Sequence, residues 1–214
     1  MPRLREVELV GVQLRRGAMA AMPASVERLR IKNCRIKQST FQSIQTNQPA
    51  HQAPPRLAEL DFSDSTELTS LELINTTAAW PHLTTIKLNG CVNLFAPLQL
   101  LGEHLSRLEV IEANGVPGTE WGIVSICDKF ARTLRRLSVA RCPLLTPDVL
   151  LIADELTNLT SLDISGCHDL TQPAFFMLAS LWPTLRFLNI SETNVDNDTV
   201  DRLRLCLPEC EIVR

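Results

Sequence analysis

The side chains best suited to hold a metal ion or to act as nucleophiles are seven cysteines and four histidines. A zinc site needs ligands that converge, usually as Cys-x-x-Cys pairs or as closely spaced histidines. The nearest two cysteines, Cys206 and Cys210, stand four residues apart. The histidines are scattered over separate segments, at His51, His82, His104 and His168. The sequence therefore predicts neither a metal site nor a cofactor.

Motifs for other kinds of catalysis are also missing from the sequence. It contains no Gly-x-Ser-x-Gly turn, which would expose a catalytic serine, and no glycine-rich loop of the P-loop or dinucleotide-binding type. Its acidic residues alternate with arginine and lysine along a predicted sheet, so they are expected to be neutralised rather than poised for acid–base work. We therefore expect a protein that is not an enzyme and has no small-molecule substrate.

Four cysteines recur at one place in a repeated pattern. They are Cys34, Cys91, Cys142 and Cys167. In other copies of the pattern Ser65, Val116 and Thr193 stand at this place, and such replacements would destroy a metal site. We interpret these cysteines as structural residues, each supplying a small side chain and a weak hydrogen-bond donor where the chain turns out of a strand.

The pattern itself is Leu-x-x-Leu-x-Leu-x-x-Cys-x-x-Leu, with a small residue allowed in place of the cysteine. Six copies follow one another at spacings of 25 or 26 residues. They begin at Leu57, Leu83, Leu108, Leu134, Leu159 and Leu185. Looser copies begin at Leu4 and Val26, and a closing half-copy is predicted from Leu207. Self-similarity at a fixed period of this length is the mark of a repeat architecture.

Each repeat contains two elements that would position these side chains. The alternating Leu-x-Leu part predicts a short strand with one buried face. The second part predicts a helix, and in 146–159 its apolar residues stand at helical spacing after Pro147. These residues are Val149, Leu150, Ile152, Ala153 and Leu156. Two other helices, in 69–83 and 172–185, are predicted to end at a Trp-Pro pair.

One strand and one helix cannot bury their own apolar surface, so neighbouring repeats must stack. We expect an α/β fold: a right-handed leucine-rich-repeat solenoid with a parallel concave sheet and convex helices. A single domain should span 1–214. Within it, 1–56 forms irregular repeats with a proline-rich loop near 46–56, 57–206 forms regular repeats, and 207–214 forms a closing strand.

The outward positions of the predicted strands carry charges of alternating sign. The middle column is Glu8, Arg30, Asp61, Lys87, Glu112, Ser138, Asp163, Asn189 and Glu211. The neighbouring column begins with Glu6, Arg28 and Glu59. Because parallel strands lie about 4.8 Å apart, the early members of each column are expected to form a cross-strand charge ladder. Its exposed pairs would select the register of the strands more than they would add stability.

Composition excludes several classes of protein. The net charge is −3 and aromatic residues make up only 5% of the chain, which disfavours a nucleic-acid partner. No run of eighteen apolar residues and no secretory signal occur, so no membrane insertion is expected. The odd number of cysteines indicates a reducing, intracellular setting, with the cytoplasm or nucleus favoured and a mitochondrial or cytoskeletal site allowed.

The repeats resemble a known family. LRRLSVARCPLLTPDVLLIADELTNL (134–159) and LTSLDISGCHDLTQPAFFMLASLWPTL (159–185) are similar to the cysteine-containing class of leucine-rich repeat. That class forms the substrate-recognition part of many F-box proteins, although no F-box is recognised in this sequence. Repeats of this class also occur in short mitochondrial proteins similar to ATP synthase subunit s and in subunits of cytoskeletal assemblies.

The resemblance implies a non-catalytic scaffold, a subunit or adaptor of a larger complex that binds proteins through its concave face. The alternatives are the substrate-recognition part of a ubiquitin ligase, a mitochondrial assembly factor, and a GTPase-regulating repeat protein with Arg141 as its exposed catalytic arginine. In the later repeats the outward residues lose their charge alternation and include apolar side chains, as in binding hot spots. We predict that the partner contacts Val110, Glu112, Asn114, Arg136, Ser138, Arg141, Asp163, Phe187 and Asn189.

Overall fold

The computed structural model describes residues 4–19, 22–37, 40–41, 56–142, 145–151 and 156–214. Within these residues nine strands form one parallel sheet, in which the strands follow one another in sequence order. They are β1 (Glu6–Val10), β3 (Arg28–Lys32), β5 (Glu59–Asp61), β6 (Thr85–Lys87), β7 (Val110–Glu112), β8 (Arg136–Ser138), β9 (Ser161–Asp163), β10 (Phe187–Asn189) and β11 (Glu211–Val213). The predicted α/β fold with a parallel sheet is confirmed.

The strands stack because each presents an apolar residue at the same level to the layer beneath the sheet. These residues pair in direct register and are at most 2% exposed. They are Leu60, Ile86, Ile111, Leu137, Leu162 and Leu188, which we call the leucine row. Burying a side chain of this size contributes about 1.5–3 kcal/mol. The leading leucines of the repeats, Leu57 to Leu185, are buried below this row.

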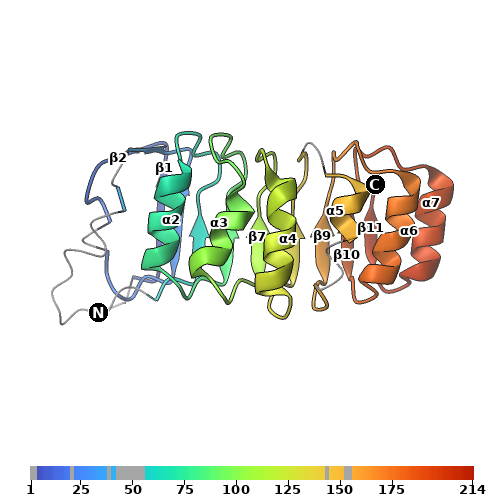
Figure 1. The fold of residues 1–214 in the computed structure, drawn as a ribbon. Coiled ribbons are helices and arrows are strands. Elements are labelled where there is room, and N and C mark those ends of the chain that lie inside the picture. The colour runs from blue at the N-terminus through green and yellow to red at the C-terminus, as the bar shows by residue number, and fades with distance from the viewer. Residues whose placement is uncertain (1–3, 20–21, 38–39, 42–55, 143–144, 152–155) are drawn as a thin grey trace.

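Helices connect the strands from Asp61 onward and all lie on one side of the sheet (Figure 1). They are α2 (Ser70–Ala79), α3 (Pro97–His104), α4 (Thr119–Phe130), α5 (Pro147–Leu151), α6 (Gln172–Leu181) and α7 (Asn197–Cys206). The Thr69 hydroxyl caps α2 by accepting a hydrogen bond from the Glu72 N–H at 3.4 Å, and Asp196 caps α7 through the Thr199 N–H at 2.8 Å. Ile152 and Ala153 of the predicted stripe lie outside the described residues.

Helices α2, α6 and α7 end in the same way. The N–H of the residue after the helix donates to the carbonyl four residues earlier, and a proline follows directly. The capping residues are Trp80, Trp182 and Leu207, and all three are buried. The prediction that Trp-Pro pairs end two of the helices is confirmed.

This helix ending corrects the register of the last repeat. Because Leu207 caps α7, it is not the leading residue of the closing half-copy. Val213, rather than Glu211, therefore pairs with Asn189, so the predicted column was wrong by two residues at its last member. The pattern search failed here because it took Leu207, the residue that ends α7, for the leading leucine of a further copy.

Each strand is followed by a tight turn whose first residue has a left-handed backbone. These residues are Gly11, Asn33, Asp64, Gly90, Gly115, Arg141, Gly166 and Glu192, with φ between 49° and 67°. Their N–H groups continue the ladder into the next coil, as from Arg141 to the Ser165 carbonyl at 2.7 Å. Glycine suits this conformation, and Gly166 is needed for a second reason: a Cβ there would lie 2.7 Å from Arg141 Cγ.

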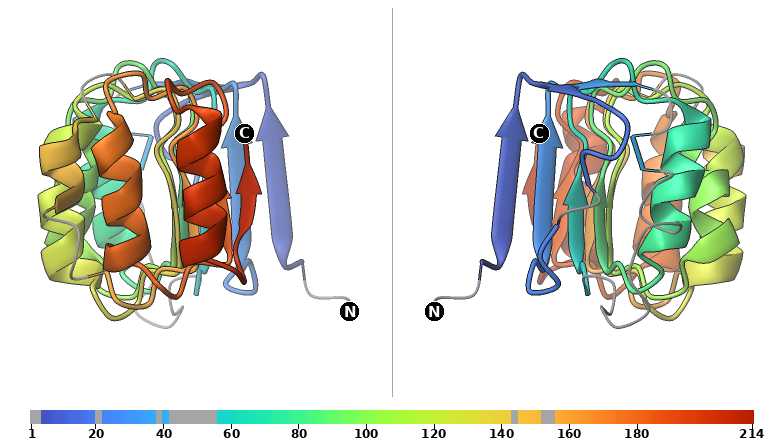
Figure 2. Two further views of the ribbon diagram at one scale, coloured as in Figure 1. Left: turned by 90° about the vertical axis from the view of Figure 1, so that its right-hand side faces the viewer. Right: turned by 90° about the vertical axis from the view of Figure 1, so that its left-hand side faces the viewer.

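The sheet is curved away from the helices. In the end-on views of Figure 2 the middle strands lie nearer the helical side of the molecule. The strands at the two ends, β1 and β11, lie farther toward the opposite side. A curved parallel sheet with helices along its outer side is a leucine-rich-repeat-like arrangement. None of the described helices is long and apolar enough to cross a lipid bilayer.

The described residues of the first two repeats differ from those of the later repeats. Their described residues contain no helix, and after the main strands they form a second small sheet from β2 (Gln13–Leu14) and β4 (Arg35–Ile36). Phe41 fills the space beneath them and packs edge-on against Phe62 and Trp80, with ring centroids 5.6 and 6.2 Å apart. The predicted proline-rich loop near 46–56 lies outside the described residues apart from Arg56.

Candidate protein-binding surface

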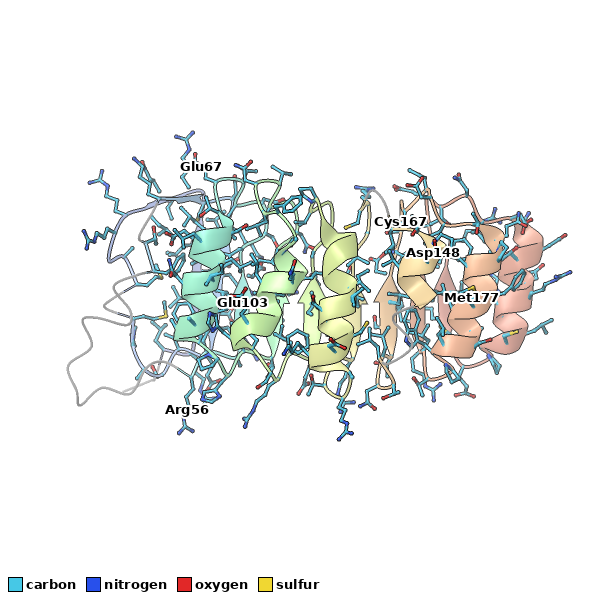
Figure 3. The ribbon with its side chains drawn as sticks, viewed as in Figure 1. Arg56, Glu67, Glu103, Asp148, Cys167 and Met177 are labelled. Atoms are coloured by element: carbon cyan, nitrogen blue, oxygen red, sulfur yellow. The ribbon has the colours of Figure 1, made fainter. Side chains whose placement is uncertain are left out.

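The face of the nine-stranded sheet turned away from the helices is here called the open face. In Figure 2 no described helix lies over it, and in Figure 3 the labelled helix residues Glu103, Asp148 and Met177 lie on the opposite side. Alternate residues of every strand point to this face, because side chains in a strand alternate between its two sides. We divide it into a charged half, from β1 to β7, and a polar half, from β8 to β10.

The charged half neutralises itself. Arg28 lies 3.7 Å from Glu6 and 3.6 Å from Glu59, and Arg30 contacts the same two carboxylates. Lys32 lies 3.5 Å from an oxygen of Glu8 and 3.5 Å from one of Asp61. Apart from Asp61, which is buried, these side chains are 20–57% exposed, so each of the exposed pairs is worth about 0–1 kcal/mol. Their shared partners make the acids and bases of this half satisfy one another.

The ladder is partly straight and partly diagonal. Arg28 contacts Glu6 and Glu59 directly opposite it, and Lys87 contacts Glu112, as predicted, but the predicted pairing of Arg30 is wrong. Arg30 stands opposite Glu8 in the strand register, but its guanidinium bridges Glu6 and Glu59. Lys32 in turn reaches Glu8 and Asp61, so Arg30 and Lys32 both lean toward acids two residues earlier in the neighbouring strands. A long basic side chain can reach these diagonal neighbours as easily as the residue directly opposite.

An asparagine bridge joins the two halves, and the sequence reasoning missed it. Asn89 Oδ1 accepts a hydrogen bond from the Asn114 N–H at 3.0 Å, and Asn114 Oδ1 accepts one from the Ala140 N–H at 2.7 Å. The Glu112 carboxylate accepts from Asn89 Nδ2 at 3.2 Å and lies 3.3 Å from Lys87. Asparagine at the same place in two successive repeats was the available signal. Asn114 and Glu112, both predicted to contact a partner, are therefore partly engaged within the chain.

In the polar half the strands end in a repeated side-chain clamp. Asp163 Oδ1 accepts hydrogen bonds from the N–H and hydroxyl of Ser165, at 3.0 and 2.8 Å. Asn189 does the same with Ser191, at 3.1 and 2.8 Å. These clamps hold one oxygen of each side chain and stiffen the strand end. Among the described residues, Asp163 forms no ion pair, in contrast to the acids of the charged half.

One row of the open face carries the large predicted contact residues. Register places Val110, Arg136, Ser161, Phe187 and Glu211 side by side on consecutive strands. Arg136 is 54% exposed and its only acidic contact among the described residues is Glu112, at 3.8 Å. Phe187 is half-buried and lies two strands away, about 10 Å from Arg136 across the small Ser161. Arginine and aromatic side chains are enriched at protein interfaces, so this row is the candidate contact region of the open face.

Two predicted outward residues are buried. Ser138 is 3% exposed and its hydroxyl donates to Asn114 Oδ1 at 2.8 Å, so its expected place on the open face needs correcting. Asp61 is 4% exposed and its Oδ1 accepts from the N–H and hydroxyl of Ser63, at 2.9 and 2.6 Å. Both side chains are short, so the longer residues on adjacent strands cover them.

Arg141 does not belong to the open face. It occupies the left-handed turn after β8, where Ala140 rather than Arg141 continues the strand row. Its guanidinium makes a two-pronged contact with the Glu192 carboxylate, at 3.0–3.3 Å, across Gly166. The pair borders a hollow of about 530 Å³ at the turn edge, which His168 also lines. A catalytic arginine would have to leave this contact before it could act on a nucleotide.

The four repeat cysteines are buried, and each thiol lies within hydrogen-bond distance of a carbonyl in the preceding coil. The Sγ–O distances are 3.4 Å from Cys34 to Leu9, 3.1 Å from Cys91 to Phe62, 3.3 Å from Cys142 to Ala113, and 3.3 Å from Cys167 to Val139. Ser65, at the same place, donates to the Ile31 carbonyl at 2.8 Å. Burial raises the pKa of the Cys91 thiol to about 12 and that of Cys167 to about 11, so both remain protonated donors at neutral pH.

Cysteine, histidine and acidic side chains do not converge into a metal-binding group anywhere in the part of the chain that the structure describes. None of the seven cysteines, all of which are described, forms a disulfide. Cys206 is exposed on α7, and Cys210 is partly buried beside β11.

Comparison with known proteins supports the fold. No family model matches the sequence, and no curated protein matches it. A chain in the crystal structure of the Rad7 and Elc1 complex in yeast has a similar structure, with a TM-score of 0.63 and 17% sequence identity. The match covers 92% of this chain and 51% of that one, so this chain spans about half the length of its structural neighbour. At this identity the likeness concerns the fold alone.

Proposed function

We propose that this chain is a non-catalytic protein-binding module that contacts its partner through the polar half of the open face. In this proposal residues 1–214 act as one leucine-rich-repeat domain whose coils wind in the right-handed sense common to strand–helix–strand connections. The module would serve as a subunit or adaptor of a larger complex. The repeat cysteines have a structural role in it, as hydrogen-bond donors between coils, and no metal or cofactor takes part.

The observation that carries the proposal is the contrast between Arg136 and Phe187 and the rest of the open face. Arg28, Arg30 and Lys32 in the charged half each contact two acids, whereas Arg136 has one acidic contact, at 3.8 Å, and is more than half exposed. Phe187 places an aromatic ring in the same row of the open face as Val110 and Arg136. Exposed arginine and aromatic side chains around a small residue supply binding energy to a protein partner without a deep pocket.

The kind of complex follows less directly from these residues. A substrate-recognition part of a ubiquitin ligase and a mitochondrial assembly factor would both use the same face. The similar yeast structure is that of a protein complex, which agrees with a role in assembly. A GTPase regulator is the weaker alternative, because the arginine it would require, Arg141, is held by Glu192.

Affinity purification of the tagged chain followed by mass spectrometry tests the proposal. We expect a small set of proteins to be retained by the wild-type chain and lost from the double variant Arg136→Glu with Phe187→Ala. The matched control is Glu103→Arg, a charge reversal on α3 on the opposite side of the molecule, which should retain the same set. Retention of every partner by the double variant would move the interface away from the open face.

A further inference from the structure

The first strand of the sheet, β1, has one edge that pairs with no other described strand, which we call its free edge. β1 lies at the end of the strand order, next to the N-terminus, and pairs only with β3 among the described strands (Figure 1). The Arg5 carbonyl and the Gly11 N–H both bond toward β3, at 2.8 and 3.1 Å. Because main-chain groups alternate along a strand, those of Glu6, Glu8 and Val10 point to the free edge. This row of donors and acceptors is a template for one more strand.

Apolar side chains on β1 are incompletely covered. Val7 and Leu9 pack against the core but remain partly exposed, whereas Leu29 and Ile31, their counterparts on β3, are 0% exposed. Val10 is 59% exposed at the end of the strand. In each later described repeat, the preceding repeat covers the corresponding apolar side chains. A strand laid along the free edge would bury these side chains in the same way.

The charges on β1 and β3 indicate which kind of strand would pair with the free edge of β1. Glu6 and Glu8 on β1 contact Arg28, Arg30 and Lys32 on β3, and their side chains remain 40% and 45% exposed. The strands of the charged half alternate acid, base, acid. A strand added beside β1 would continue this alternation if it carried basic residues. These would lie beside Glu6 and Glu8, and its apolar residues would lie beside Val7 and Leu9.

The opposite end of the sheet does not offer an equivalent edge. Strand β11 has three residues against five in β1, which limits it as a template. The Arg214 guanidinium donates to the Val195 carbonyl at 3.0 Å, which ties the end of the chain to the turn before α7. Short, tethered edge strands are the usual protection against unwanted pairing, and β1 lacks both features.

We propose that the free edge of β1 binds an extended segment of a partner protein in which basic and apolar residues alternate. The interaction is strand addition: main-chain hydrogen bonds to Glu6, Glu8 and Val10 hold the segment, and the two carboxylates select its basic side chains. A second copy of this chain is a poor occupant, because pairing two β1 edges would bring Glu6 and Glu8 against each other. This surface is separate from the open face of β8–β10, so either binding proposal can fail without the other.

The chain supplies its own probe. Residues 26–33 read VERLRIKN, and their strand RLRIK already satisfies β1 on its other side. A fluorescent peptide of this sequence, titrated into the full chain and followed by anisotropy, should bind saturably. The charge-reversed peptide VEELEIEN should bind at least about tenfold more weakly. Equal binding of the two peptides, or none by either, overturns the proposal.

Variants of Val10 separate edge pairing from displacement of β3. Val10→Pro removes an N–H that faces the free edge and leaves the hydrogen bonds to β3 in place, so it should weaken the peptide at least about tenfold. The control Val10→Ala keeps the N–H and should weaken it by less. Circular dichroism and thermal unfolding verify that both variants fold. Unchanged peptide binding by a folded Val10→Pro variant would show that the peptide replaces β3, and would refute edge pairing.

Sedimentation velocity tests whether a second copy of this chain occupies the free edge of β1. The chain without peptide is expected to be monomeric through this edge. A dimer that Val10→Pro dissociates and that the peptide cannot displace would assign the edge to a second copy, against the proposal.

Discussion

The charged and polar halves of the open face share one backbone and differ in what their outward side chains do. In both, the strands pair in register and the same leucine row is buried underneath. In the charged half, Arg30 and Lys32 each touch two acids, so the surface satisfies itself. In the polar half, Asp163 and Asn189 are clamped by serines, and Arg136 and Phe187 are left for a partner. A repeat fold thus leaves stability to the buried layer and frees the outward residues to differ.

The largest expected effect is a difference in reaction rate between exposed and buried thiols. It tests whether the layer beneath the sheet is equally inaccessible to reagents in both halves. With native protein at about pH 8, Cys206 should react readily with iodoacetamide, because it is exposed. Cys91 in the charged half and Cys167 in the polar half should react at least about 1000-fold more slowly, because burial both shields them and raises their pKa. Mass spectrometry of digested samples measures the rates. Comparable labelling of all three in folded protein would contradict the buried role.

The same shifts predict the pH dependence of stability. In the unfolded chain these thiols ionise near pH 9, whereas in the folded chain the Cys91 thiol stays protonated until about pH 12. Their contribution is therefore complete below pH 9 and is lost as the pH rises toward 12. The free energy of unfolding of Cys91→Ala should fall less steeply over this range than that of the wild type.

The second largest effect is expected from truncating residues of the leucine row. It tests whether the buried layer stabilises both halves equally. Leu60→Ala and Leu162→Ala should each lower the free energy of unfolding by about 2–5 kcal/mol, because each leaves a cavity in a fully packed layer. The two losses should agree within about 1 kcal/mol, as measured by urea denaturation. A loss confined to one variant would show that the two halves are not held by the same packing.

The binding contrast between the halves is the third expected effect. Once a partner is identified, Arg136→Glu with Phe187→Ala should weaken it at least about tenfold. Arg30→Ala, in the charged half, should change the affinity by less than about twofold, because its guanidinium is engaged with Glu6 and Glu59. Isothermal titration calorimetry gives both values. The reverse order of effects would place the interface on the charged half.

The smallest expected effect on stability distinguishes acids that form ion pairs, such as Glu59, from acids held by a serine, such as Asp163. Glu59→Gln removes a carboxylate shared by Arg28 and Arg30, and should lower the free energy of unfolding by less than about 1 kcal/mol in dilute buffer and by almost nothing in concentrated salt. Asp163→Asn keeps the oxygen that Ser165 requires, as Asn189 does one repeat later, and should be nearly neutral at both salt concentrations. A salt-dependent loss for Asp163→Asn would reveal an ionic role for that residue.

The fold was predictable because its signal is repeated. Leading leucines at a spacing of 25 or 26 residues placed the strands in sequence order, and Trp80 and Trp182 marked two helix ends. The prediction failed in the last repeat, where Leu207 caps α7 and Val213 pairs with Asn189, two residues later than predicted. A search keyed to leucine accepts whichever leucine is nearest, even when its role is to close a helix.

The surface was predictable only in part. Alternation of charge indicated that the early strands neutralise one another, but the diagonal pairing depends on how far Arg30 and Lys32 reach. The placement of Arg141 was missed because a single residue of turn rotates its side chain away from the open face. The free edge of β1 could not be read at all, because an edge is defined by what lies beside a strand in space.

The sequence by itself determined the repeat, the parallel order of the strands and the inward leucines, because all of these depend on residue types at regular spacing within one short segment. Only the tertiary structure decided that Ser138 and Asp61 are buried, that Asn89 and Asn114 bridge neighbouring coils, and that Arg136 remains exposed. Whether a side chain is covered or satisfied is set by residues about one repeat away along the chain and one strand away in space, where contacts of a few ångströms decide the outcome.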